Sequence, residues 1–193
     1  SWVLKETIQS MTYWASQSPE MAGVKVAVNF SAHQLNNPTL VEQYLHEIKQ
    51  ADVAAELITF EITESMLIDD LEQGSQILNR ISSLGCDISI DDFGTGYSSL
   101  QYLKHLPIKN LKIDKGFVNG IPGDESDMSI VEAIISLAKA MGMHVIAEGI
   151  ETEEQVQFLT DLGCDMMQGY YFSKPLSKDQ LLQKLIGQNG LEG

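Results

Sequence analysis

The sequence predicts an α/β fold: an incomplete (β/α)8 barrel of the TIM type with about six strand–helix units. Short β-branched runs alternate with helical stretches six times, which is typical of right-handed βαβ units and a parallel sheet. The strands carry bulky apolar residues at one parity and small or polar residues at the other, whereas a doubly wound sheet is apolar on both faces. A closed barrel of this type takes eight units and about 250 residues, but this chain has 193.

Six segments are expected to form the strands. In chain order they are Val24–Phe30, Leu57–Ile62, Asp87–Asp91, Asn110–Asp114, His144–Glu148 and Asp165–Gln168. In the second of them, Ile58, Phe60 and Ile62 share one parity, and Thr59 and Glu61 share the other. Successive side chains of a strand point to opposite faces. Helices therefore cover the apolar face, and the polar face lines the inside of the barrel.

The helices are predicted from their capping residues. Asn37-Pro38 opens one helix, and the stretches that begin at Thr152 and at Ser177 have the spacing of a capping box. The predicted helices run over 1–17, from Asn37 to about Ala51, from Asp69 to Gly85, over Ser129–Met141 after a cap at Asp127, from Thr152 to Gly163, and from Ser177 onward.

Composition narrows the class of protein. The 12 Lys and Arg against 27 Asp and Glu give a net charge of −15, which disfavours binding to a nucleic-acid polymer. No apolar run approaches the roughly 20 residues of a membrane span. No linker interrupts the chain, so one domain over 1–193 is expected. Two cysteines without metal-type spacing favour a cytoplasmic location, which leaves open a membrane anchor in a longer parent protein.

Polar side chains recur where the predicted strands end, and active sites of barrels lie at that end. These residues are Asn29, Glu61, Asp91, Asp92, Lys112, Glu148 and Gln168. Several carboxylates in one cavity require a cation, and oxygen ligands suit Mg²⁺ or Mn²⁺. The adjacent carboxylates Asp91 and Asp92 are suited to two metal ions, and Lys112 to orienting water or a phosphate. The residues alone thus predict a metal-dependent phosphoesterase.

Structural alternatives stay open for each of these residues. A single acidic residue after a strand is commonly a helix cap or a solvated loop residue, and Lys112 can instead form a salt bridge to Asp114 or Asp91. The loop 92–100 contains Gly94 and Gly96, but it lacks the pattern of a phosphate-binding loop. It is either a mobile lid beside the ligands or an ordinary turn.

Six ordered segments resemble the motifs of the EAL domain, a family of bacterial cyclic di-GMP phosphodiesterases with a modified (β/α)8 barrel. The resemblance extends over nearly the whole chain. The segments are Val28–Ala32, Phe60–Ser65, Asp91–Leu100, Leu111–Asp114, Val145–Thr152 and Gln168–Tyr170.

The resemblance implies Mg²⁺- or Mn²⁺-dependent hydrolysis of cyclic di-GMP to the linear dinucleotide, and a homodimer. It implies a metal shell of Asn29, Glu61, Asp91, Asp92 and Glu148, with Lys112, Asp92 and Glu148 as catalytic residues. Lys112 resembles the lysine that positions or activates the attacking water. Glu64 resembles the residue that holds the lid loop. Residues of this loop and of the substrate site are Glu64, Gly94, Thr95, Gly96, Glu151 and Gln168.

The sequence contains no Glu-Ala-Leu segment, and no counterpart of the family's first two strands. We therefore expect an N-terminally truncated domain with a weakened metal site and impaired turnover. Exposed barrel edges predict a dimer, with exchange of elements between the chains as one route. The alternatives are a receptor that binds cyclic di-GMP without cleaving it and a dimerising interaction module.

Overall fold

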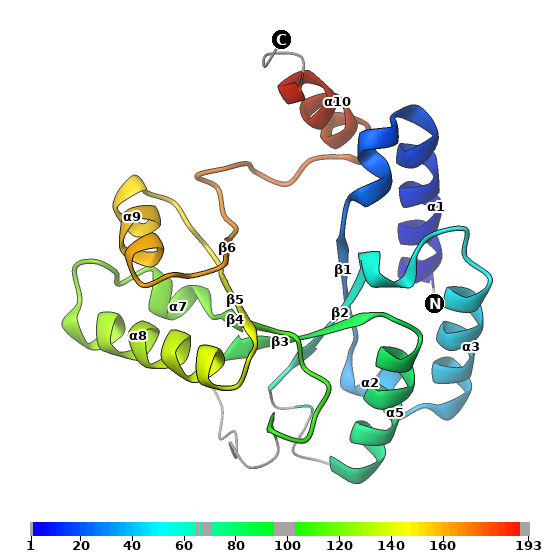
Figure 1. Ribbon diagram of the computed structural model, residues 1–193, viewed down its shortest axis with the longest axis horizontal. Helices are drawn as coiled ribbons and strands as arrows, with labels where there is room; N and C mark the ends of the chain where they lie inside the picture. The colour runs from blue at the N-terminus through cyan, green and yellow to red at the C-terminus, as the bar shows by residue number, and fades with distance from the viewer. Residues whose placement is uncertain (1, 65, 67–70, 95–102, 190–193) are drawn as a thin grey trace.

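The computed structural model describes residues 2–64, 66, 71–94 and 103–189 of the chain, and it confirms the predicted incomplete barrel. Its strands form one parallel six-stranded sheet in the order β1-β2-β3-β4-β5-β6, so each strand pairs with the next in the chain (Figure 1). The strands are β1 (Val26–Asn29), β2 (Ile58–Thr63), β3 (Asp87–Phe93), β4 (Asn110–Ile113), β5 (His144–Ala147) and β6 (Met166–Met167). Within the described residues, β1 and β6 each have a single neighbour.

The last strand has half its expected length. The predicted segment Asp165–Gln168 shortens to the two residues of β6, which pair with β5. The Asp165 carboxylate, rather than its backbone, accepts the N–H of Val145 at 2.8 Å. A side chain therefore replaces a ladder bond at this position.

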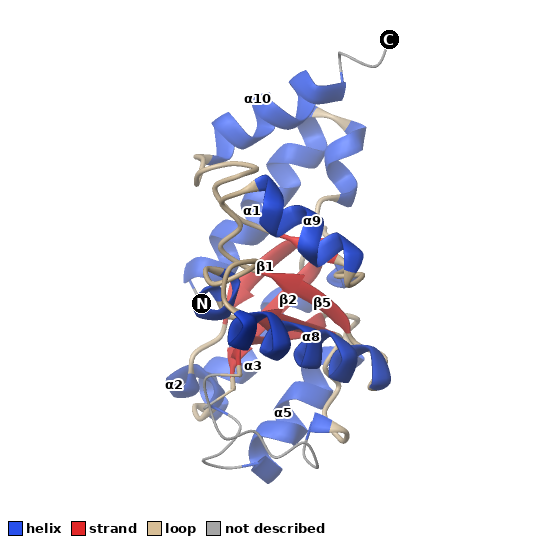
Figure 2. Ribbon diagram, turned by 90° about the vertical axis from the view of Figure 1, so that its left-hand side faces the viewer, coloured by secondary structure: helices blue, strands red, loops and turns tan. Residues whose placement is uncertain are grey.

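The helices lie around the outside of the curved sheet (Figures 1 and 2). The long ones are α1 (Trp2–Gln17), α3 (Pro38–Lys49), α5 (Leu71–Ser83), α8 (Glu125–Ala140), α9 (Glu153–Asp161) and α10 (Lys178–Asn189). Shorter elements are α2 (Ala32–Leu35), α7 (Lys115–Val118) and the 3-10 turns Pro19–Gly23 and Ala55–Leu57. After β6 the chain leads to α10, whose first residue lies against α1. There the indole N–H of Trp14 donates to the carbonyl of Lys178 at 3.1 Å.

The capping residues test the predicted helix limits. The Asn37 side chain accepts two backbone N–H groups at the start of α3, and Thr152 forms a reciprocal capping box with Gln155. The predicted cap at Asp127 is wrong: the carboxylate of Asp124 accepts the N–H groups of residues 126 and 127, so α8 starts earlier. The predicted start at Asp69 lies outside the described residues.

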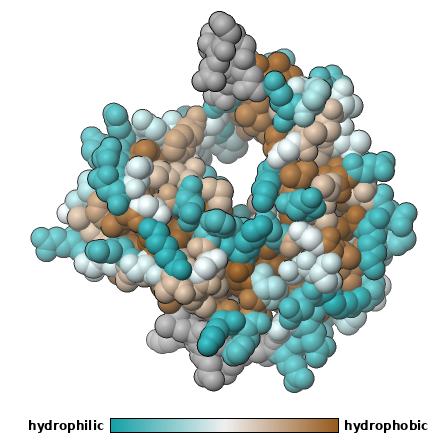
Figure 3. Space-filling view, viewed as in Figure 1, coloured by the Kyte–Doolittle hydropathy of each residue, from teal (hydrophilic) through white to brown (hydrophobic). Residues whose placement is uncertain are grey.

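The two faces of the sheet differ as the parity predicts. Ile58, Phe60 and Ile62 are fully buried against the helices. Residues from all six strands line a cavity of about 580 Å³ on the other face, among them Thr59 and Glu61. The space-filling view is hollowed at its centre (Figure 3). Among the described residues, no helix has the length and apolarity to cross a bilayer.

The amino end of the sheet carries a structural ion cluster. The buried carboxylate of Asp87 pairs with Lys109 at 2.9 Å and with Lys25 at 3.0 Å. The three residues lie at or just before the starts of β1, β3 and β4, so one carboxylate links three strands. Both Asp87 oxygens are used within this cluster. The cluster therefore lies at the end of the sheet opposite to the predicted polar residues.

Candidate active site

The parallel register brings the predicted polar residues to one end of the sheet. Asn29 pairs with Glu61 in the β1–β2 ladder, and Thr63 pairs with Asp91 in the β2–β3 ladder. Glu148 follows β5 directly, and its backbone N–H donates to Ile113 of β4. The strands are parallel, so their carboxyl ends meet, as in other barrels.

Three carboxylates converge closely enough to share a cation. Asp91, Asp92 and Glu148 each place an oxygen within 4.8 Å of the other two. Oxygen-only donors are the ligands that Mg²⁺ and Mn²⁺ prefer. The donor set therefore fits the predicted cofactor. Glu61 is not part of this closest group, and Asn29 lies beside Glu61 in the β1–β2 register.

Lys112 is the cation at the centre of the site. It is 3% exposed, and its ammonium lies 2.6 Å from Glu148, 2.8 Å from Glu61 and 3.1 Å from Asp91. Burial alone would lower the pKa of Lys112, but its hydrogen bonds to Glu148 and Glu61 raise it. The lysine is therefore charged and compensates the carboxylates around it. The alternative salt bridge to Asp91 is present as part of this larger cluster.

The acidic residues are also perturbed by their surroundings. Burial raises the pKa of Glu148, and the charges of Asp91 and Glu61 act in the same direction, while Lys112 opposes them. Burial raises the pKa of Asp92 as well, followed by the charges of Asp91 and Asp114. Both carboxylates are therefore partly buried and close to other negative charges, a condition that a divalent cation relieves.

Asp92 has an unusual backbone. Its φ of 53° places a residue other than glycine in the left-handed region, where strain is commonly maintained for function. Its N–H donates to the Asp91 carboxylate at 3.0 Å. This geometry turns two consecutive carboxylates toward the same site, although alternation along a strand would separate them.

Glu64 holds the start of the predicted loop. Its side chain is 3% exposed, and one carboxylate oxygen accepts the N–H of Gly94 at 3.1 Å. Gly94 has a φ of 99°, which favours glycine. Thr95 and Gly96 lie outside the described residues, so the predicted lid stays a prediction beyond its first contact.

The remaining predicted residues lie beside Glu148. The amide of Gln168 donates to the Glu148 carboxylate. Glu151 instead pairs with Lys115 at 2.7 Å. Sequence reasoning missed Lys115 because its partner is 36 residues away. The ring of Tyr170, in the segment after the last strand, lies 5.9 Å from the Lys115 ammonium.

Comparison with known proteins agrees with this geometry. The EAL domain family model matches residues 1–175. The chain is 42% identical over 178 residues to the cyclic di-GMP phosphodiesterase NbdA of Pseudomonas aeruginosa, covering 91% of this chain and 22% of that protein. It spans about a quarter of the length of the curated relatives that it matches.

Solved structures share the fold. The MucR phosphodiesterase of P. aeruginosa in complex with cyclic di-GMP is 40% identical with a TM-score of 0.87, over 93% of this chain and 72% of that one. The BlrP1 protein of Klebsiella pneumoniae, in complex with manganese and cyclic di-GMP, is 27% identical with a TM-score of 0.78, over 91% and 44% of the two chains.

Proposed function

Because the chain belongs to the EAL domain family, we propose that its carboxyl-end site acts on cyclic di-GMP and hydrolyses it to the linear dinucleotide. The observation that carries the proposal is the convergence of three carboxylates within 4.8 Å of one another beside a buried lysine. The relatives named for cyclic di-GMP hydrolysis, and the complexes with this nucleotide, support the choice of substrate.

Asp91, Asp92 and Glu148 would hold Mg²⁺ or Mn²⁺, together with Asn29 and Glu61 from the neighbouring strands. Such ions, when bound, supply Lewis-acid activation of a phosphodiester and of water. The crowded, partly buried carboxylates supply the negative charge that attracts a divalent cation and fix its place at the ends of the strands. Their fixed positions on strand ends keep this arrangement rigid.

Lys112 acts within the same cluster. Its ammonium is held by three carboxylates, so it is fixed in position and charged at neutral pH. A fixed ammonium orients an attacking water or stabilises charge that develops on the phosphate. Gln168 holds the Glu148 carboxylate from the other side. Glu64 anchors the start of the loop that follows Asp92.

A product assay tests the proposal. The chain, its Asp91→Asn variant and NbdA are incubated in parallel with cyclic di-GMP and Mn²⁺, and the linear dinucleotide is quantified by chromatography. We expect the chain to form product, and this product to disappear in Asp91→Asn. Nucleotide that binds without any Asp91-dependent product would indicate a receptor instead.

We also propose that the chain forms a homodimer, with exchange of elements as one route. The supporting observation is the open sheet, in which β1 and β6 have one strand neighbour each within the described part of the chain. Unpaired strand edges favour association. Light scattering coupled to gel filtration is expected to give twice the 21.4 kDa chain mass. A monodisperse monomer at high protein concentration would exclude the dimer.

A further inference from the structure

Lys115 lies at the start of α7, directly after β4, and contacts two neighbouring segments of the site. Its ammonium pairs with Glu151 at 2.7 Å and lies 5.9 Å from the centre of the Tyr170 ring. Glu151 belongs to the segment after β5, and Tyr170 to the segment after β6. One side chain therefore connects the carboxyl ends of three adjacent strands.

The stem of Lys115 fills the place of a missing side chain. Gly149 has a φ of 72°, and a β-carbon on it would collide with the Cβ, Cγ and Cδ atoms of Lys115. The lysine stem thus packs directly on the backbone next to Glu148. Such close approach requires glycine, and the aliphatic part of a lysine is well suited to cover it.

The chain after β6 holds the other side of the segment 148–151. The Ile150 N–H donates to Gln168 at 3.1 Å, and the Ile150 carbonyl accepts from Tyr171 at 2.9 Å. A β-carbon on Gly169 would collide with the Ile150 backbone. Residues 148–151 are therefore enclosed between Lys115 on one side and residues 168–171 on the other.

We propose that Lys115 is a positioning residue, which fixes the segment 148–151 and thereby the carboxylate of Glu148 at the metal site. The consequence for metal binding rests on the proposed function, whereas the restraint on the segment does not. Because Glu148 adjoins Gly149, any movement of this backbone moves a carboxylate that also contacts Lys112 and Gln168. Partners that orient a metal ligand typically change metal affinity by 10- to 100-fold.

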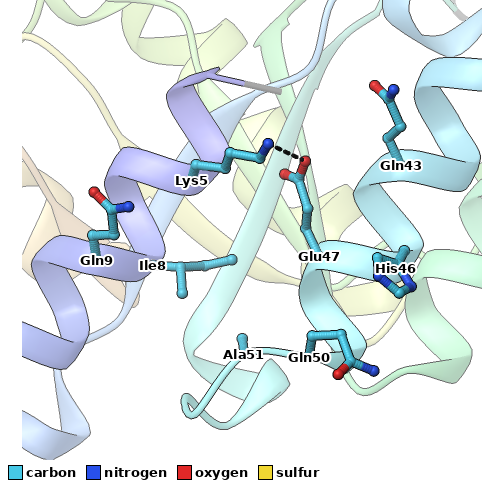
Figure 4. A pocket seen from close by; sticks show the side chains of 8 residues that line it. All are labelled: Lys5, Ile8, Gln9, Gln43, His46, Glu47, Gln50 and Ala51. Carbon is cyan, nitrogen blue, oxygen red and sulfur yellow. Dashed lines mark ion pairs between the residues drawn. The ribbon is translucent and has the colours of Figure 1, made fainter.

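An exposed ion pair is by itself worth little, so the test needs a matched pair elsewhere. Lys5 and Glu47 provide it: they join α1 to α3 at 3.4 Å in a groove between these helices (Figure 4). The Lys5 side chain is 59% exposed, compared with 49% for Lys115. The Glu47 side chain is 14% exposed, compared with 49% for Glu151. The pair lies in the outer helical layer, so Lys5→Ala controls for the loss of a lysine ion pair outside the site.

Four variants separate the charge from the stem: Lys115→Ala removes both, Lys115→Met keeps most of the stem, Lys115→Arg keeps the charge, and Lys5→Ala is the control. Hydrogen exchange is measured on the amides of Glu148, Ile150 and Glu151 without metal. Mn²⁺ affinity is measured from the free ion by electron paramagnetic resonance.

Lys115→Ala is expected to exchange several-fold faster at these amides and to bind Mn²⁺ about tenfold more weakly. Lys115→Arg is expected to restore both values, and Lys5→Ala to change neither.

Unchanged exchange in Lys115→Ala would overturn the inference, because the segment would then be held without the lysine. Faster exchange with unchanged Mn²⁺ affinity would overturn it too, because the restraint would not reach Glu148. If the Asp91→Asn variant binds Mn²⁺ as tightly as the parent chain, the proposed metal site is wrong, whatever Lys115 does. The exchange comparison still decides whether Lys115 holds the segment 148–151.

Discussion

Replacement of Glu148 by Gln is expected to abolish specific Mn²⁺ binding without destabilising the metal-free protein. The side chain is 17% exposed, accepts a hydrogen bond from Gln168 and pairs with Lys112. Glutamine keeps the shape of this side chain but removes one of the three carboxylates of the closest group. We expect Mn²⁺ affinity to fall by at least about 100-fold, since even a partner of a ligand costs 10- to 100-fold, and product formation to fall below detection.

Glu148→Gln lowers Mn²⁺ affinity, but it is expected to maintain or raise the stability of the metal-free protein. The pKa of Glu148 is raised in the folded state, mainly by burial. Such a group contributes stability below its unfolded pKa, and this contribution is lost as pH rises through the folded pKa. At neutral pH the ionised Glu148 is therefore a cost, and Glu148→Gln removes it. Thermal unfolding in EDTA should give an equal or higher midpoint for the variant, with a weaker decline from mildly acidic to neutral pH.

A matched substitution on the surface controls for charge. Glu132→Gln removes one exposed carboxylate from the middle of α8 and should change neither Mn²⁺ affinity nor the pH dependence. Calorimetric titration of both variants with Mn²⁺ makes the comparison direct. Equal affinities of Glu148→Gln and the parent chain would refute the placement of the metal at Asp91, Asp92 and Glu148.

The fold was predictable because its signals are local. Alternation of apolar and polar residues, as in Ile58, Thr59 and Phe60, fixes which face of a strand is buried. Capping residues such as Asn37 act on neighbouring backbone groups, so their spacing is visible in the sequence. The misplaced cap at Asp127 shows the limit: two acidic residues three positions apart are both suitable, and only backbone conformation selects Asp124.

The site was predictable only in part, for a related reason. Strand ends can be read from the sequence, so the group of Asp91, Asp92, Lys112 and Glu148 follows from the fold. Contacts between segments that are distant in the chain cannot be read in this way. No motif around Lys115 indicates that it contacts Glu151 or that it packs on Gly149. The position of Lys115 relative to these residues depends on the register of three strands, which the sequence specifies only through packing.

Lys112→Met is expected to destabilise the metal-free protein more than any other single substitution considered. Removal of the buried ammonium leaves the carboxylates of Glu61, Asp91 and Glu148 without their shared partner. Loss of one partner from a buried ion cluster typically costs about 3–5 kcal/mol. Urea unfolding in EDTA measures this loss. The variant lacks the ammonium that opposes the raised pKa of Glu148, whose main cause is burial. Its stability should therefore recover as pH falls and Glu148 is protonated.

Addition of Mn²⁺ distinguishes the contribution of Lys112 to stability from its contribution to turnover. A divalent cation at the carboxylates replaces the lost positive charge, so it should stabilise Lys112→Met more than the parent chain. Turnover should stay undetectable, because the ion does not replace the ammonium that we propose orients water or stabilises charge on the phosphate. If the single variant does not fold, Lys112→Met with Glu61→Gln, which removes one uncompensated carboxylate, should recover part of the stability. Unchanged stability of Lys112→Met without metal would show that Lys112 is not the compensating charge of these carboxylates.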